Sequence, residues 1–163
     1  MTNNDILRRI RYIFDVNDST MMAIFGLADY QVTRSQISNW LKKDDDPAYQ
    51  ACHDTQFALF LNGFIHQKRG KKEGVQPKAE TRLTNNMIFM KLKIALDLRA
   101  EDILEILALS NVRISKHELS ALFRRPGHKH YRDCQNQILR NFLTGLQRKY
   151  RPTGGEHESG NSV

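Results

Sequence analysis

The chain contains one segment twice, and this duplication limits its possible folds more than any other feature. When the sequence is shifted by 82 residues, residues 3–67 align with residues 85–149 without a gap. Twelve of the 65 aligned positions are identical, whereas average residue usage gives roughly four identities by chance. Apolar residues also recur at equivalent positions, as Phe64 does with Leu146. A repeat that keeps its buried positions keeps its fold, so we expect two copies of one small domain.

Both copies have the sequence pattern of helices. Apolar residues follow helical spacing, as in the stretch from Phe57 to Phe64. The segment Thr33 to Gln36 has the form of a capping box, and Ser115 to Glu118 has the same form at the equivalent place. We therefore predict an all-α protein with two homologous repeats of about four helices each, related by pseudo-two-fold symmetry. A helix-turn-helix-like segment, Thr20 to Lys43 in the first copy, is expected in each.

Composition divides the chain into four segments. We predict helical repeat one at residues 1–69, a polar linker at 70–84, basic helical repeat two at 85–151 and a disordered tail at 152–163. The linker is rich in Gly, Pro and charged residues. The tail has too few apolar side chains to bury.

Some details of the helices can also be predicted. Asn3 or Asn4 is expected to cap the first helix, and Asp54 the fourth. Gly63 and Gly145 lie inside helices, where glycine costs about 1 kcal/mol relative to alanine. Because both copies carry this cost, we expect a close helix–helix crossing at each glycine, with copy against copy as one possibility. The Asp15 and Asp97 pair is typical of turns, although a paired-carboxylate site is a conceivable alternative.

The positive charge is concentrated in the second copy. The formal net charge is +7. Residues 1–69 hold 8 basic and 8 acidic side chains, whereas residues 85–151 hold 13 and 6. Any binding site for an acidic partner is therefore expected in repeat two.

Two cysteines are too few for a disulfide framework and suit a reducing compartment. No apolar run approaches the ~18 residues that span a bilayer, and the first residues lack the apolar core of a signal peptide. We expect a cytoplasmic protein that makes no use of a membrane.

Four motifs carry a family resemblance. They are NNDILRRIRYIF and FLNGFIHQKRG in the first copy, and NNMIFMKLKIAL and RNFLTGLQRKY in the second. Together they resemble the YehS-like family, a bacterial family whose small helical domain occurs in tandem. The resemblance covers residues 3 to about 150. It implies the fold, but the family has no known function and brings no site with it.

Nucleic acid is the partner that the charge favours most. In a helix-turn-helix the second helix enters the major groove, which selects Arg34, Gln36 and Asn39 as candidate base contacts in repeat one. Plain helix packing is the alternative reading of that segment. In repeat two the candidate contacts with DNA or RNA are basic or aromatic in character: Arg113, Lys116, Arg124, Arg125, His128, Lys129, His130 and Arg132. One alternative there is a solvated basic surface, and another is an intramolecular contact between the basic residues of 124–130 and the acidic loop at 44–46.

Other kinds of site find less support. His128, His130 and Cys134 have a spacing that suits a metal, but repeat one lacks such ligands, and we predict neither a metal nor a cofactor. The sequence contains no recognisable catalytic motif, so we expect a binding protein rather than an enzyme. The alternative function is a protein–protein adaptor, for which the adaptable Met21-Met22 pair is the candidate contact. The biological function itself is not predicted.

Overall fold

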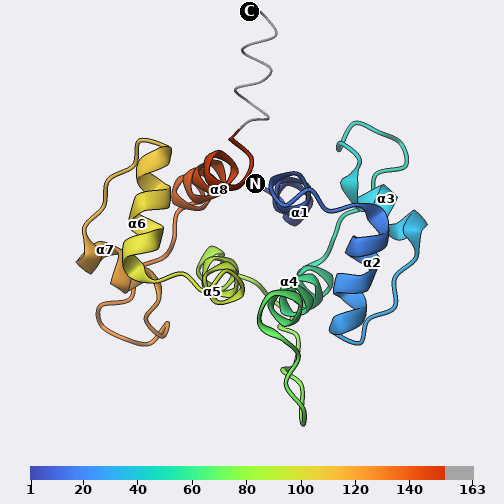
Figure 1. Ribbon diagram of the computed structural model, residues 1–163, viewed down its shortest axis with the longest axis horizontal. Helices are drawn as coiled ribbons and strands as arrows, with labels where there is room; N and C mark the ends of the chain where they lie inside the picture. Colours follow the sequence, from blue (N-terminus) through green and yellow to red (C-terminus); the bar gives the residue numbers. More distant parts are fainter. Residues whose placement is uncertain (153–163) are drawn as a thin grey trace, which may run out of the picture. The chain divides into compact units, whose positions relative to one another are not determined.

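The structure is a computed structural model that describes residues 1–152, so most of the expected tail, 153–163, lies outside the described residues. In this part of the chain all regular structure is helical (Figure 1). The helices are α1 (Asn3–Ile13), α2 (Asp18–Leu27), α3 (Arg34–Leu41), α4 (Asp54–Arg69), α5 (Asn85–Ala95), α6 (Ala100–Leu109), α7 (Lys116–Leu122) and α8 (Asn136–Tyr150). The prediction of an all-α fold with four helices in each repeat is confirmed.

The helices of the two repeats begin at equivalent residues. A shift of 82 residues takes the starts of α1, α2, α3 and α4 onto those of α5, α6, α7 and α8. The capping boxes at Thr33 and Ser115 both form, each with the N-cap hydroxyl and the third helical residue bonded reciprocally. Phe60 and Phe142, which occupy equivalent positions in α4 and α8, are both fully buried. The duplication in the sequence is therefore a duplication of local structure.

The chain forms two compact units, whose division differs from that of the repeats. The first unit runs from Met1 to Asp97 and the second begins at Leu98. α5 is the first helix of repeat two in sequence, yet it packs along α4 within the first unit (Figure 1). One polar link between them joins Lys91 Nζ to Asn62 Oδ1 at 2.6 Å. The first unit is thus one helix longer than a repeat, and the second is one helix shorter.

The close crossings at the glycines lie inside each repeat rather than between the copies. A Cβ atom on Gly63 of α4 would stand 1.9 Å from the carbonyl oxygen of Ile24 in α2. On Gly145 of α8 it would stand 2.1 Å from the carbonyl oxygen of Ile106 in α6. Only a hydrogen atom fits these spaces, which explains why both repeats carry glycine within a helix. The expectation of a close crossing is confirmed, and the copy-against-copy possibility is wrong.

The paired acidic residues belong to turns. Asp15 and Asp97 follow α1 and α5 with φ of 52° and 53°. Asp29 and Asn111, the equivalent residues after α2 and α6, have φ of 58° and 63°. Apart from glycine, Asp and Asn tolerate this left-handed conformation best, because their short polar side chains bond to nearby backbone. The turn interpretation of the Asp15 and Asp97 pair is therefore confirmed.

Two predicted helix caps are wrong by one or two residues. Thr2, not Asn3 or Asn4, caps α1 by accepting from the N–H of Asp5 at 3.1 Å. His53, not Asp54, is the N-cap of α4. In each case the predicted side chain bonds to a distant part of the chain instead. Asp54, for example, accepts from the backbone N–H of Leu83 in the linker at 2.9 Å.

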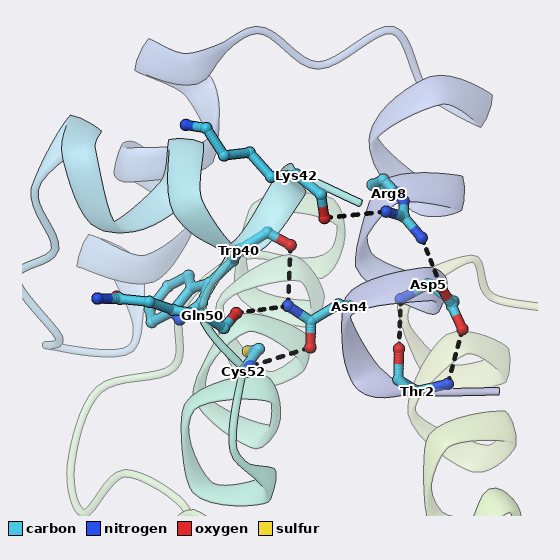
Figure 2. A network of polar contacts seen from close by, with 8 residues as sticks. All are labelled: Thr2, Asn4, Asp5, Arg8, Trp40, Lys42, Gln50 and Cys52. Carbon is cyan, nitrogen blue, oxygen red and sulfur yellow. Dashed lines mark hydrogen bonds and ion pairs between the residues drawn. The ribbon is translucent and has the colours of Figure 1, made fainter. Parts of the chain in front are cut away.

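Asn4 joins α1 to the segment that follows α3 (Figure 2). Its Nδ2 donates to the carbonyl oxygens of Trp40 and Gln50 at 2.9 and 2.8 Å. Its Oδ1 accepts from the N–H of Cys52 at 3.0 Å. Asn4 is 2% exposed, and its amide is saturated by backbone groups. This buried side chain therefore fixes both ends of the loop between α3 and α4.

The core of repeat one is aromatic. Phe25 lies at its centre, with ring centroids 5.5 Å from Trp40 and 5.4 Å from Phe60. In repeat two the residue equivalent to Phe25 is Leu107, which is also fully buried. The two repeats thus share a backbone framework but fill it with side chains of different size.

Candidate functional site

The described part of repeat two contains a groove beside α7. Its volume is about 370 Å³, and it is open to solvent on one side. Its walls come from the residues before and within α7, from the loop that follows α7, and from the start of α8. The lining residues are Ile114, His117, Glu118, Ala121, Leu122, His130, Arg132 and Ile138. We call this feature the α7 groove.

Two lining residues of the α7 groove, Ala121 and Leu122, have smaller side chains than their counterparts in repeat one. Leu122 corresponds to Trp40, whose indole packs on Phe25. Val112 corresponds to Tyr30, whose ring centroid is 5.9 Å from that of Phe25. Interiors are close-packed, so aliphatic side chains in place of rings leave space that the framework does not recover fully. We infer that this loss of side-chain volume contributes to the α7 groove.

The segment 124–132, which we call the basic loop, keeps the backbone hydrogen bonds of its counterpart in repeat one. The N–H of Arg132 donates to the carbonyl oxygen of Ala121 at 3.1 Å, as that of Gln50 does to Asn39 at 3.2 Å. The N–H of His128 donates to the carbonyl oxygen of Arg125 at 2.9 Å. The same loop conformation is therefore built from a basic sequence in repeat two and from a sequence with three aspartates and two lysines in repeat one.

Three imidazoles lie together at the groove. The ring centroid of His130 is 6.3 Å from that of His117 and 5.5 Å from that of His128. Cys134, the third ligand of the candidate metal motif, is buried, and its Sγ donates to the carbonyl oxygen of Gln135 at 3.7 Å. In residues 1–152 the structure groups no three His, Cys, Asp or Glu side chains in a way that could hold a metal ion. The imidazoles thus offer ring faces and ring nitrogens to a ligand at the groove.

Apart from Arg132, the cations predicted as contacts in repeat two fall into two groups. Lys116 is paired with Glu101, Nζ to Oε1 at 2.7 Å, and this bond holds the pKa of Glu101 below its usual value. The other group is exposed, and among residues 98–152 its members make no ion pair and no side-chain hydrogen bond: Arg113, Arg124, Arg125 and Lys129. This second group is free to meet an external anion.

Each of these cations is close in sequence to a residue of the α7 groove. Arg113 precedes Ile114, and Lys129 precedes His130. Arg124 and Arg125 begin the basic loop, whose last residue, Arg132, lines the groove. The structure therefore brings His130 and Arg132 to one groove, with the exposed cations in the adjoining segments.

The predicted contacts of repeat one are largely engaged within the protein. Gln36 Oε1 accepts from the N–H of Thr33 at 2.9 Å, so it is unavailable for the bidentate contact that adenine recognition requires. Arg34 lies 3.7 Å from Asp18 and donates to Ser19 at 3.1 Å. Asn39 Oδ1 accepts from Lys42 Nζ at 3.3 Å. These bonds favour the packing interpretation of the segment over the helix-turn-helix interpretation.

Sequence reasoning missed the apolar part of the groove. The groove residues Ile114, Ala121, Leu122 and Ile138 are not among the predicted contacts, and His117 is predicted only as part of the Ser115 to Glu118 capping box. A signal for them exists in the sequence, since Ala121 and Leu122 stand where the first copy has Asn39 and Trp40. At these two positions the second copy has the smaller side chain.

The side chain proposed for the adaptor is not at the surface. Met21 is fully buried within unit one, although Met22 is partly exposed. The Met21-Met22 pair therefore cannot serve as an exposed contact, and the expectation is wrong on this point. None of the helices in residues 1–152 combines the length and the apolar character that a membrane crossing requires.

The fold defines a class: an all-α protein made of one helical domain in tandem. The family model described as "Protein of unknown function (DUF1456)" matches residues 3–70 and again residues 85–152. The chain therefore belongs to this family. It is 43% identical over 147 residues to "Uncharacterized protein YehS" of Escherichia coli (strain K12), covering 90% of this chain and 94% of that protein. No solved structure matches the chain significantly.

Proposed function

We propose that the protein binds nucleic acid through repeat two, with the basic loop as the main contact. The observation that carries the proposal is the group of exposed cations at Arg113, Arg124, Arg125 and Lys129, which make no ion pair within residues 98–152. Arginine and lysine that neutralise phosphates release counterions, and this release is the main source of sequence-independent affinity. Unpaired cations need not first break an internal bond to do so.

The contrast with repeat one supports the proposal. The counterpart of the basic loop, residues 42–50, begins with Lys42 and Lys43 but continues with three aspartates, which the basic loop lacks. Arg8, Arg34 and Arg69 are all within 4 Å of a carboxylate. Since the two loops share their backbone hydrogen bonds, the difference in charge is independent of the fold. A functional requirement in repeat two alone is a sufficient reason for this divergence.

The proposal is tested by charge reversal with a matched control. The test variant carries Arg124→Glu, Arg125→Glu and Lys129→Glu, and the control carries Lys43→Glu, Lys72→Glu and Lys78→Glu. All six side chains are exposed, and both variants change the net charge by the same amount. Fluorescence anisotropy with labelled single-stranded and duplex oligonucleotides measures affinity over a range of salt concentrations.

The test variant is expected to lose affinity and salt dependence. The slope of log affinity against log salt should fall by about 0.7 to 0.9 for each phosphate contact removed. The control should keep the slope of the natural protein. Failure of the natural protein to bind either form at low salt, or an equal loss in both variants, would refute the proposal.

A further inference from the structure

We infer that the α7 groove binds one unstacked base of a single-stranded nucleic acid, an inference that rests on the proposed function. The groove volume of about 370 Å³ falls within the roughly 300–1,000 Å³ of small-molecule sites. A nucleobase is a flat heterocycle that needs an apolar surface for its face and polar groups for its edge. The α7 groove supplies both within a single unit of the fold.

The apolar part of the groove suits the face of a base. Aliphatic groups come from the segment before α7, from its last turn and from α8: Ile114, Ala121, Leu122 and Ile138. In a duplex both faces of each base are already covered by neighbours. Only a base that has left the stack can use such a surface, as in single strands and loops. This selects single strands over duplexes.

The polar part of the groove suits the edge of a base. The imidazoles of His117 and His130 offer ring nitrogens and ring faces, and Arg132 brings a positive charge to the same wall. Glu118 Oε1 is engaged by the N–H of Ser115 at 3.0 Å, which helps to hold the pKa of Glu118 below its usual value. The carboxylate is therefore a fixed, ionised acceptor, suited to the exocyclic amino group of a base.

Charge complementarity commits the groove to a nucleic acid strand rather than to an apolar peptide. The cations Arg113 and Lys129 are each adjacent in sequence to a lining residue, Ile114 and His130. A base in the groove carries phosphates on both sides, and these need cations at its rim. Base stacking with phosphate neutralisation on adjacent positive groups is the general mode of single-strand binding.

The experiment separates the contribution of the base to affinity from that of the phosphates. Anisotropy compares the protein's affinity for a short single strand with that for an abasic strand, which has the same phosphates but no bases. The natural protein should bind the base-bearing strand about tenfold more tightly, the value expected for one accommodated base. Ala121→Leu, which places a larger side chain in the groove, should abolish this preference and leave abasic binding unchanged.

A matched control and a second variant keep the result decisive. Ala108→Leu adds the same atoms at an exposed position of α6 and should keep the preference. His130→Ala introduces the residue type that repeat one has at the equivalent position, Ala48. This variant should reduce the preference for the base-bearing strand. If Ala121→Leu fails to fold by circular dichroism, His130→Ala decides the question.

The remaining outcomes distinguish the inference from the proposed function. Equal binding of both strands by the natural protein overturns base binding while phosphate binding stands. Preference retained in a folded Ala121→Leu variant also overturns it. Binding of neither strand at low salt overturns the proposed function and this inference together.

Discussion

The Nδ1 atom of His128 accepts a hydrogen bond from the backbone N–H of His130 at 3.0 Å. At the equivalent turn of repeat one, Asp46 Oδ1 accepts from the N–H of Ala48 at 2.9 Å. An imidazole nitrogen can accept a hydrogen bond through its lone pair, as a carboxylate oxygen does. Histidine and aspartate thus perform the same structural role with different charge.

This equivalence gives a first prediction. His128→Asp should preserve the turn, because the aspartate of repeat one already accepts there, whereas His128→Ala should leave the N–H of His130 without its acceptor. We expect faster amide exchange at His130 in the alanine variant and a cost of up to about 1 kcal/mol in the free energy of unfolding. Exchange measured by NMR would contradict this if the aspartate and alanine variants were equally fast.

A second prediction concerns the helix crossings. Gly63→Ala and Gly145→Ala place a methyl group against the carbonyl oxygens of Ile24 and Ile106, at 1.9 and 2.1 Å before relaxation. Since both opposing atoms are backbone, the helices must move apart. We expect each substitution to lower the free energy of unfolding by about 3 kcal/mol or more, as measured by urea denaturation.

Gly26 is the matched control for these substitutions. It also lies in a helix, α2, but a Cβ atom there would have no neighbour within 4 Å. Gly26→Ala should therefore be stabilising by up to about 1 kcal/mol, because alanine is the better helix former. A loss of stability similar to that of Gly63→Ala would argue against the steric explanation.

A third prediction concerns Asn4, whose amide serves three backbone groups (Figure 2). Asn4→Ala should cost about 2–4 kcal/mol in the free energy of unfolding, because buried polar groups lose their partners. Asn4→Asp should cost more, since a carboxylate has no N–H for the carbonyl oxygens of Trp40 and Gln50. Asn3→Ala, at a half-buried neighbour, is the control and should cost less in the same denaturation experiment.

A fourth prediction concerns alkaline pH. Burial, together with the negative charge of Asp54, raises the pKa of Cys52 from 9.0 to about 12. The unfolded chain ionises this thiol near its ordinary pKa, whereas the folded chain keeps it protonated. The contribution of Cys52 to stability is therefore complete below pH 9 and is lost as the pH rises toward 12.

The measurement is the free energy of unfolding as a function of pH. In the Cys52→Ala variant the free energy of unfolding should fall less steeply with alkaline pH than in the natural protein, because the variant lacks the thiol whose pKa is raised by folding. In the folded natural protein, thiol reagents should modify Cys52 slowly at neutral pH, since the thiolate is the reactive form. Identical alkaline slopes for variant and natural protein would contradict the assignment.

The fold was predictable from the sequence to the extent that it depends on local patterns. Apolar spacing, capping boxes and the gapless repeat predict four helices in each copy, because each signal acts within a few residues. The cap of α1 was misplaced because Asn3 and Asn4 are as suitable for capping as Thr2. Only the three-dimensional structure shows that Asn4 is instead needed by Trp40 and Gln50.

The candidate site was predictable only in its charge. The basic residues of the loop stand out in the sequence, but a groove depends on volume that is missing between elements, and no single residue reports it. The exchange of Trp40 for Leu122 is visible in the alignment of the repeats. Its consequence becomes visible only when α7, the basic loop and the start of α8 are placed around the same space.

The packing of α5 on α4 bears on how the protein can be dissected. A truncation at residue 84, the boundary between the two repeats, would remove α5 from α4. The apolar surface between these helices would then be exposed to solvent. The C-terminal fragment would begin with α5, which would lack α4 as its packing partner. Because α5 covers α4, the smallest N-terminal fragment expected to fold unaided ends at Asp97 rather than where the first repeat ends.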